Sequence, residues 1–561
     1  MKILQNTVVF CMMVFLTTTS FLLKGQNGKD FEISRNLDIY VTLFRELNLN
    51  YVDELKPGDL MKTGITAMLE SLDPYTNYIP ESDIEDYEFM TTGQYGGIGA
   101  LIHRQGEYVV ISEPYENSPA DKTGLKAGDK ILSINGQSAL GKTTDEVSTI
   151  LKGQPNTTLN LMIERTGNPQ PLPFSITREQ ITVANIPYYG ILDSGAGYIK
   201  LSGFTQNAGA EVRNAFVEMR EKQPLNGLIL DLRGNGGGLL QEAVNITNIF
   251  VDKGELVVST KGKLPDRNRS YSTENTAIDT QIPLIVLVDN TSASASEIVA
   301  GAIQDIDRGI IIGQRTFGKG LVQNVVPLSY NSKMKVTVAK YYIPSGRCIQ
   351  AIDYSHKDEN GRFTKIPDSL ISEFKTRNGR SVYDGGGIEP DIEIDIPQLS
   401  SISYALYTKF LIFDYATHYF WSHPSIPPAN QFEINDSIYQ DFLSFLSGKD
   451  YTYTTSSEKV MNDLKAIAEK EEVYDDITAE YEALEAKIQK SKLDDLQESR
   501  NELETILRQE IVTRYYYEVG RIISSLKDDP EIKKANELLL RGEIYRSILD
   551  GTYTGQDQTD E

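Results

Sequence analysis

The strongest constraint on the fold is a series of apolar strands that alternate with helical segments between residues 180 and 400. Residues 227–232 and 282–288 are continuous apolar runs, and helices are expected at residues 208–222 and 239–250. Buried strands separated by helices are typical of layered α/β proteins. The pattern therefore predicts an α/β core over residues 180–400.

The rest of the chain divides into regions of different character. The 561 residues correspond to about three to five domains. Residues 30–91 have helical spacing, and residues 92–178 combine glycine-rich turns with short β-prone runs. Residues 401–561 are rich in charged helices and end in an acidic tail. The predicted fold class is multidomain α+β, with helical N-terminal and C-terminal regions.

The C-terminal region carries an apolar stripe, which favours helix-on-helix packing within the chain or between chains. A homo-oligomer held by these helices is one expectation. The stripe consists of Leu484, Ile488, Leu496, Leu503, Leu507 and Ile511.

The first 25 residues predict a signal peptide or an N-terminal membrane anchor. Lys2 precedes an uncharged apolar stretch at residues 7–23, and the chain then turns polar. The stretch is long for a signal peptide and short for a membrane span, so a buried core helix is a third interpretation. If the segment is removed, Cys348 is the only thiol left.

Composition excludes several classes of protein. The net charge of −24 argues against nucleic-acid binding, which needs a basic face. With 4 His and 2 Cys, a cysteine-rich zinc module and a disulfide scaffold are excluded. A Ser-His-Asp hydrolase would have to use one of four histidines, which are His103, His356, His418 and His423.

Two short segments carry the candidate chemistry. The sequence Ser-Ala-Ser-Ala-Ser-Glu at residues 292–297 follows an apolar strand and opens a helix, where backbone N–H groups can stabilise an oxyanion. Lys319 lies between two glycines and apolar strands, where burial would lower its pKa and make it a general base. Read separately, the serines could simply cap a helix, and Lys319 could lie in a surface turn.

Together the two segments resemble the C-terminal processing peptidases, also called tail-specific proteases. In this family the middle serine of the motif is the nucleophile, which corresponds to Ser294 here. The family's lysine lies 25 positions later, at Lys319, and a glutamine four positions beyond it corresponds to Gln323. The resemblance implies a Ser-Lys catalytic site in which Gln323 orients the amine.

The resemblance also implies an oxyanion hole and a fold. The family's Asp-x-Arg-x-Asn-x-Gly-Gly loop matches residues 231–238, so Gly237 and Ala295 are assigned as the N–H donors, with Gly236 and Gly238 as rivals to Gly237. The α/β core of this family is crotonase-like or ClpP-like. The resemblance covers residues 35–400. Residues 351–385 are a longer insertion than the family leads us to expect.

Residues 92–178 resemble a PDZ domain of the bacterial protease type. Tyr-Gly-Gly-Ile-Gly at residues 95–99 precedes Ser-Pro-Ala and a Gly-Leu-Lys-Ala-Gly-Asp turn. In that family such a loop binds a peptide C-terminal carboxylate, and a strand edge pairs with the peptide. The residues predicted to bind the peptide are Gly97, Ile98, Gly99, Val147 and Leu151. The alternative is a glycine-rich hairpin without a ligand.

These resemblances predict an exported serine endopeptidase that recognises protein or peptide substrates by their C-termini. It would act in a bacterial periplasm or at the periplasmic face of the inner membrane. No metal or organic cofactor is expected. The alternatives are a catalytically silent PDZ scaffold on the same fold and an enoyl-CoA hydratase-like enzyme.

Overall fold

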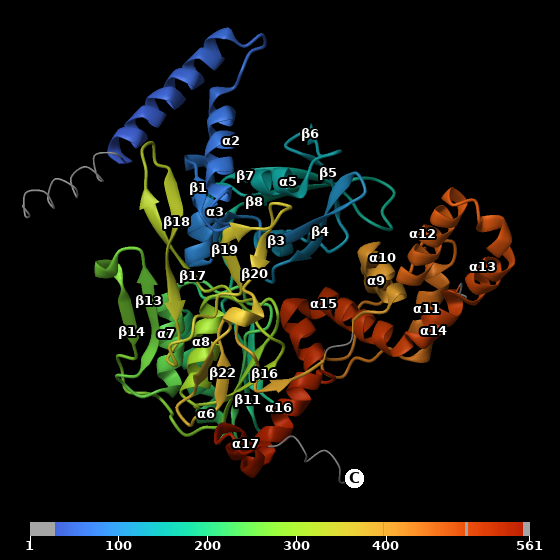
Figure 1. Cartoon of the computed structure of the whole chain (residues 1–561). Helices are drawn as coiled ribbons and strands as arrows, with labels where there is room; N and C mark the ends of the chain where they lie inside the picture. Colours follow the sequence, from blue (N-terminus) through green and yellow to red (C-terminus); the bar gives the residue numbers. More distant parts are fainter. Residues whose placement is uncertain (1–28, 396–397, 489–491, 554–561) are drawn as a thin grey trace, which may run out of the picture.

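The computed structural model describes residues 29–395, 398–488 and 492–553, which Figure 1 colours from blue to red along the chain. The predicted N-terminal segment, residues 1–25, and the acidic tail, residues 555–561, lie outside the described residues. The remaining chain forms N-terminal helices, a PDZ fold, an α/β core and C-terminal helices, which confirms the multidomain α+β class.

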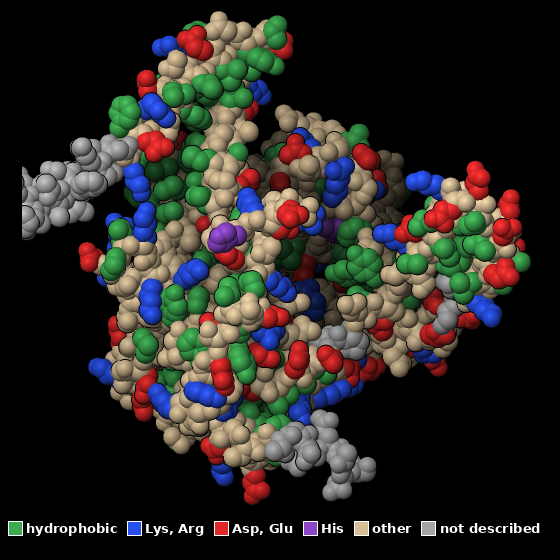
Figure 2. Space-filling view, in the orientation of Figure 1, with side chains coloured by type: hydrophobic (Ala, Val, Ile, Leu, Met, Phe, Trp, Pro, Cys, Tyr) green, Lys and Arg blue, Asp and Glu red, His purple; other side chains and the backbone are tan. Residues whose placement is uncertain are grey.

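Two helices project from the body at the N-terminal end (Figure 1). Residues 29–50 are helical, and α2 (Pro57–Glu70) returns toward the core. Large apolar side chains along the first helix, such as Phe31 and Leu37, are exposed. Figure 2 shows hydrophobic side chains in green over the projecting N-terminal helices. Within the described ranges, no helix combines the length and apolar character needed to cross a membrane.

The predicted helical region, residues 30–91, is interrupted by a short strand that joins a sheet. The Asp73 carboxylate accepts hydrogen bonds from the backbone N–H groups of Tyr75 and Thr76, which turns the chain. Strand β1 (Asn77–Ile79) then pairs with β18 (Lys333–Tyr342), and α3 (Ile84–Thr92) follows. The N-terminal region is therefore fastened to the α/β core.

The PDZ fold is an antiparallel sheet of strand order β3-β4-β5-β7-β8 with two helices. Its core consists of alternating apolar residues such as Ile111, Ile131 and Leu161. The flanking strands β2 (Gln94–Gly97) and β9 (Glu179–Thr182) pair with each other and close the domain. The elements are β3 (Ala100–Gln105), β4 (Tyr108–Pro114), α4 (Pro119–Lys122), β5 (Lys130–Ile134), β6 (Gln137–Ser138), α5 (Thr144–Leu151), β7 (Thr158–Glu164) and β8 (Leu172–Thr177).

The α/β core contains a six-stranded sheet of order β10-β11-β12-β15-β16-β23, which is parallel except where β10 meets β11. Helices α6, α7 and α8 pack on the face that carries Leu230 and Val286. The elements are β10 (Tyr188–Ile191), β11 (Gly197–Lys200), α6 (Ala208–Lys222), β12 (Leu228–Asp231), α7 (Leu240–Phe250), β15 (Leu284–Val288), α8 (Ala295–Asp305), β16 (Ile310–Gly313) and β23 (Ile392–Glu393).

Beside this sheet lies an antiparallel sheet of β1, β18, β13 (Leu256–Gly262), β14 (Arg269–Ser272) and β17 (Leu321–Pro327). The insertion at residues 351–385 forms two hairpins. Strand β19 (Ile352–Lys357) pairs with β20 (Phe363–Lys365), and β21 (Glu373–Lys375) pairs with β22 (Ser381–Tyr383).

The C-terminal helices form a second core and also complete the first. Leu496, Leu503, Leu507 and Ile511 are buried in a helical cluster, which confirms packing within the chain for that part of the stripe. Leu484 is exposed, and the Ile488 side chain lies outside the described residues. The helices are α9 (Ser401–Thr408), α10 (Leu411–Ser422), α11 (Asp436–Leu446), α12 (Ser456–Lys470), α13 (Tyr474–Ile488), α14 (Lys492–Glu498) and α15 (Arg500–Leu526).

The last two helices, α16 (Pro530–Leu540) and α17 (Gly542–Leu549), leave that cluster and cover the second face of the six-stranded sheet (Figure 1). Leu538 packs there with Ile229 and Ile285. The Tyr545 hydroxyl hydrogen-bonds to the backbone of Leu284 in β15. Because these strands are apolar on both faces, the core needs this second layer.

Candidate active site

Ser294 lies at the junction between β15 and α8 in an uncommon backbone conformation. Its φ of 56° and ψ of −111° are strained for a residue with a Cβ atom, and such strain is concentrated at functional sites. Ser292 and Ser296 of the same motif are buried and donate to the carbonyls of Leu232 and Asn235. Ser294 alone of the three motif serines is half-buried rather than fully buried.

A buried carboxylate joins the serine segment to the lysine segment. Glu297 Oε2 accepts the backbone N–H groups of Ser294 (2.8 Å) and Lys319 (2.9 Å). Its Oε1 accepts the Gly318 N–H (2.7 Å) and the Thr316 hydroxyl (2.6 Å). Burial raises the pKa of Glu297, and these four hydrogen bonds oppose the rise. Glu297 thus holds the backbones of the two candidate catalytic residues close to each other.

The Lys319 side chain is half-buried rather than part of a solvated surface turn. Burial, assisted by the charge of Lys335, lowers the pKa of Lys319 to about 8, although Glu297 and Asp73 act in the opposite direction. The ammonium nitrogen lies 4.3 Å from the centre of the Tyr75 ring. An amine with this pKa is neutral in part of the population near neutral pH and can accept a proton.

Tyr341 also contacts both segments, although no motif in the sequence points to it. It is buried, its hydroxyl donates to the Lys319 carbonyl, and it interacts with the Ser294 side chain. Among the described residues, no hydrogen bond joins the Ser294 hydroxyl to the Lys319 amine. Such bonds are often long or unaligned in unliganded enzymes, so this geometry does not argue against the pair.

Gln323 lies on β17, on the same stretch of chain as Lys319, but its amide is engaged elsewhere. Its Nε2 donates to the Thr337 hydroxyl on β18 at 3.2 Å. The Thr337 hydroxyl in turn lies 3.3 Å from that of Thr76. The predicted role of Gln323 in orienting Lys319 stays a prediction.

The loop that contains Gly237 approaches the N-terminus of α8. A Cβ atom on Gly237, whose φ is +97°, would lie 2.8 Å from both the Ala295 nitrogen and the Ser294 Cβ. Only glycine fits this approach. The Ala295 N–H has no acceptor within its own helix, as expected at a helix start. The Gly237 N–H donates to the Asn235 side chain at 2.9 Å, so its oxyanion role stays a prediction.

The rival glycines lie in different surroundings. A Cβ atom on Gly238 would lie 2.5 Å from the Phe204 carbonyl oxygen, whereas one on Gly236 would meet no atom within 4 Å. Neither approaches Ser294 as Gly237 does.

None of the described histidines is placed to serve Ser294. His103 belongs to the PDZ fold, where it stacks on Phe410 of the C-terminal helices. His356 is exposed on β19 beside Asp353. His418 and His423 lie in or next to α10. The contacts of the described histidines therefore give no support to a Ser-His-Asp site at Ser294.

The predicted carboxylate-binding loop of the PDZ fold is present, but the two helical residues predicted to line the peptide groove are more deeply buried than expected. The Ile98 and Gly99 carbonyls accept the Ala120 N–H and the Ser118 hydroxyl, which fixes the loop. Val147 and Leu151 are only 0% and 5% exposed, so both belong to the domain core.

The strand after this loop has an edge that carries no other strand. Strand β3 pairs with β4 alone among the described strands, which is the arrangement that peptide pairing at a sheet edge requires. The partly buried Ile102 and Ile150 pack at the margin of the core, on β3 and α5. The roles of Gly97 and the other predicted groove residues stay predictions.

Three family models match different parts of the chain. Residues 195–356 match the model "Peptidase family S41", and residues 110–165 match the model "PDZ domain". Residues 402–539 match the model "Probable PDZ-protease, C-terminal helical domain". The matches fall on the α/β core, the PDZ fold and the C-terminal helices described above.

Similar proteins are found among bacterial proteases. The chain is 34% identical over 355 residues to a carboxy-terminal-processing protease of Bartonella bacilliformis, covering 62% of this chain and 81% of the relative. It is 30% identical over 412 residues to a probable CtpA-like serine protease of Staphylococcus aureus, covering 73% of this chain and 75% of the relative. A solved structure, the photosystem II D1 C-terminal processing protease, is 29% identical with a TM-score of 0.36, covering 64% and 92%.

Proposed function

Because this chain belongs to peptidase family S41 and is a serine-type C-terminal processing protease, we propose that it captures exported polypeptides by their free C-termini and cleaves them at Ser294. The observation that carries the proposal is the Glu297 bridge. One buried carboxylate holds the backbones of Ser294 and Lys319, and the Lys319 amine beside them has a pKa near 8.

The reaction begins with an unprotonated Lys319. The Ser294 hydroxyl attacks the peptide carbonyl carbon while the Lys319 amine accepts its proton. The carbonyl oxygen becomes an oxyanion, which the Ala295 and Gly237 N–H groups stabilise. For this, the Gly237 N–H exchanges the Asn235 side chain for the substrate oxygen.

Collapse of the tetrahedral intermediate breaks the C–N bond. The leaving amine takes the proton from the Lys319 ammonium, and the acyl group stays on Ser294. A water molecule then attacks this ester as the Lys319 amine accepts a proton from it. When the second intermediate collapses, that proton passes to the Ser294 oxygen and the new C-terminal product leaves. The same base serves both halves of the reaction.

Substrate capture is assigned to the PDZ fold. The loop at residues 97–99 would bind the terminal carboxylate, and the open edge of β3 would pair with the peptide backbone. The apolar stretch at residues 7–23, which lies outside the described residues, supports export to the periplasm or to the periplasmic face of the inner membrane. Oligomer formation through the C-terminal helices remains an expectation.

Matched peptides with a free acid or an amide at the C-terminus test this function in the full-length protein. The free acid should be cleaved faster at sub-saturating concentration, because amidation removes the anion and should weaken binding by about 1–3 kcal/mol. Ser294→Ala should cleave neither peptide. Equal cleavage rates for both peptides would show that the protein does not recognise the C-terminal carboxylate. Cleavage by Ser294→Ala would show that Ser294 is not the nucleophile.

A further inference from the structure

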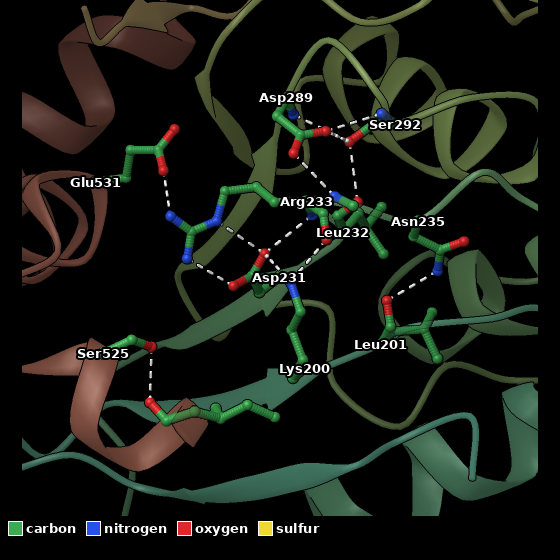
Figure 3. Close-up of polar contacts among 12 residues, drawn as sticks. Lys200, Leu201, Asp231, Leu232, Arg233, Asn235, Asp289, Ser292, Ser525 and Glu531 are labelled. Carbon is green, nitrogen blue, oxygen red and sulfur yellow. Dashed lines mark hydrogen bonds and ion pairs between the residues drawn. The ribbon is translucent and has the colours of Figure 1, made fainter. Parts of the chain in front are cut away.

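Arg233 connects the C-terminal helices to the loop that carries Gly237. Figure 3 shows Arg233 between the end of β12 and the start of α16. Its guanidinium donates to both carboxylate oxygens of Asp231, at 3.0 and 2.7 Å. It also donates to Asp529 at 2.7 Å and to Glu531. A planar guanidinium can serve several carboxylates in fixed directions, which a lysine cannot do.

This network is largely buried and tightly packed, with the Arg233 and Asp529 side chains 16% and 13% exposed. Glu531 is fully buried, and a Cβ atom added to Gly313 at the end of β16 would lie 2.8 Å from its Oε1. Burial raises the pKa of Glu531, while the charge of Arg233 opposes the rise. Breaking a buried ion pair leaves a charge without a partner, which is costly. The position of Arg233 is therefore coupled to that of α16.

The acidic partners are themselves held rigidly. Asp529 caps α16, because its side chain accepts the N–H groups of Glu531 and Ile532. Further along the helix, Leu538 and Leu539 are buried against the six-stranded sheet. Helix α16 thus presents two carboxylates to Arg233 from a fixed platform.

From Arg233 the same loop runs directly to the candidate oxyanion hole. The Lys200 ammonium donates to the Arg233 carbonyl at 2.7 Å, which fixes the start of the loop. The next residue, Gly234, donates its N–H to Asp289 at 2.9 Å, and Asp289 belongs to the loop that leads to Ser294. Gly237, four residues after Arg233, lies against Ser294. A shift of Arg233 would therefore displace both the loop that carries Gly237 and the loop that leads to Ser294.

We propose that Asp529 and Glu531 are positioning residues for peptide hydrolysis. They hold Arg233 and so keep the Gly237 loop in place for the transition state. This inference rests on the proposed function. It makes the C-terminal helical region part of the active-site structure, although it supplies no group that touches substrate.

The test compares Asp529→Asn and Glu531→Gln with Glu537→Gln in the full-length protein. Asn can still cap a helix, and Gln is close to Glu in shape, so both changes mainly remove charge. Glu537 lies on the same helix and pairs with Lys534 and Arg541, away from Arg233, which makes its variant a matched control.

We expect kcat to fall about ten- to a hundredfold in the first two variants with KM unchanged, because a misplaced catalytic group weakens the transition state and leaves ground-state binding intact. Thermal unfolding shows whether Asp529→Asn or Glu531→Gln fails to fold. If one of them does, the kinetics of the other variant test the inference. Kinetics equal to those of Glu537→Gln, or a higher KM at constant kcat, would overturn the inference. If wild type cleaves no peptide, the proposed function itself fails, whereas active wild type with unaffected variants removes only this inference.

Discussion

The two faces of the six-stranded sheet are covered in different ways. The face with Leu230 and Val286 is covered by α6, α7 and α8, which alternate with the strands along the chain. The opposite face, with Ile229 and Ile285, is covered by α16 and α17 from the end of the chain. The first face therefore forms from local sequence, and the second needs a contact between distant segments.

The two faces also differ in their relation to the candidate active site. Helix α8 of the first face begins next to Ser294 and contains Glu297, which also binds the backbone of Lys319. Helix α16 of the second face carries Asp529 and Glu531, which reach the site only through Arg233. Changes to the catalytic groups beside the first face should lower the rate with little effect on stability, whereas changes to buried apolar residues of the second face should lower stability.

The largest effect is expected from Lys319→Arg. A general base has to lose its proton, and an arginine effectively never does, so cleavage should fall roughly 10⁴-fold or more while the protein stays folded. Peptide cleavage and thermal unfolding measure the two properties. Lys333→Arg, a change of the same kind on β18, should retain activity. Wild-type turnover in Lys319→Arg would show that this residue contributes only charge.

The second face is tested by Leu538→Ala beside Leu540→Ala. Leu538 is 0% exposed against the sheet, whereas its neighbour Leu540 is 66% exposed on the same helix. Leu538→Ala should lower the free energy of unfolding by about 2–5 kcal/mol, and Leu540→Ala should change it by about 0.5 kcal/mol or less. Urea unfolding gives both values. Equal effects would mean that α16 does not form the second layer.

A smaller effect concerns pH. Because the neutral form of Lys319 is the base and its pKa is about 8, kcat/KM should rise about tenfold per pH unit below that value and level off above it. Lys335→Gln should move the inflection to higher pH, since the Lys335 charge lowers the pKa of Lys319. Lys333→Gln is the matched control. A profile that stays flat between roughly pH 6 and 9 would exclude Lys319 as the base.

The sequence predicts the local features of the fold and site well. The strands and helices of the core are read from apolar runs, and Ser294 and Lys319 stand in short motifs. Glu297 could also have been found, because a serine followed three residues later by glutamate is the pattern of a capping box. Its additional bonds to Gly318 and Lys319 could not, since they join separate segments.

The features that sequence reasoning missed depend on distant contacts. Arg233 meets Asp529 and Glu531 across 296 and 298 positions, and no periodicity reveals such a pairing. The apolar face of α16 is equally compatible with helix packing and with sheet packing. The groove role of Val147 stays a prediction, because core and groove residues of such a domain are both apolar and share one side of a helix.

We propose above that Ser294 is a nucleophile activated by Lys319. Labelling the full-length protein with a fluorophosphonate, followed by mass spectrometry of its peptides, tests it most directly. We expect one adduct, on Ser294, in wild type and none in Ser294→Ala or Lys319→Arg. An adduct on Ser292 or Ser296, or equal labelling of Lys319→Arg, would contradict it.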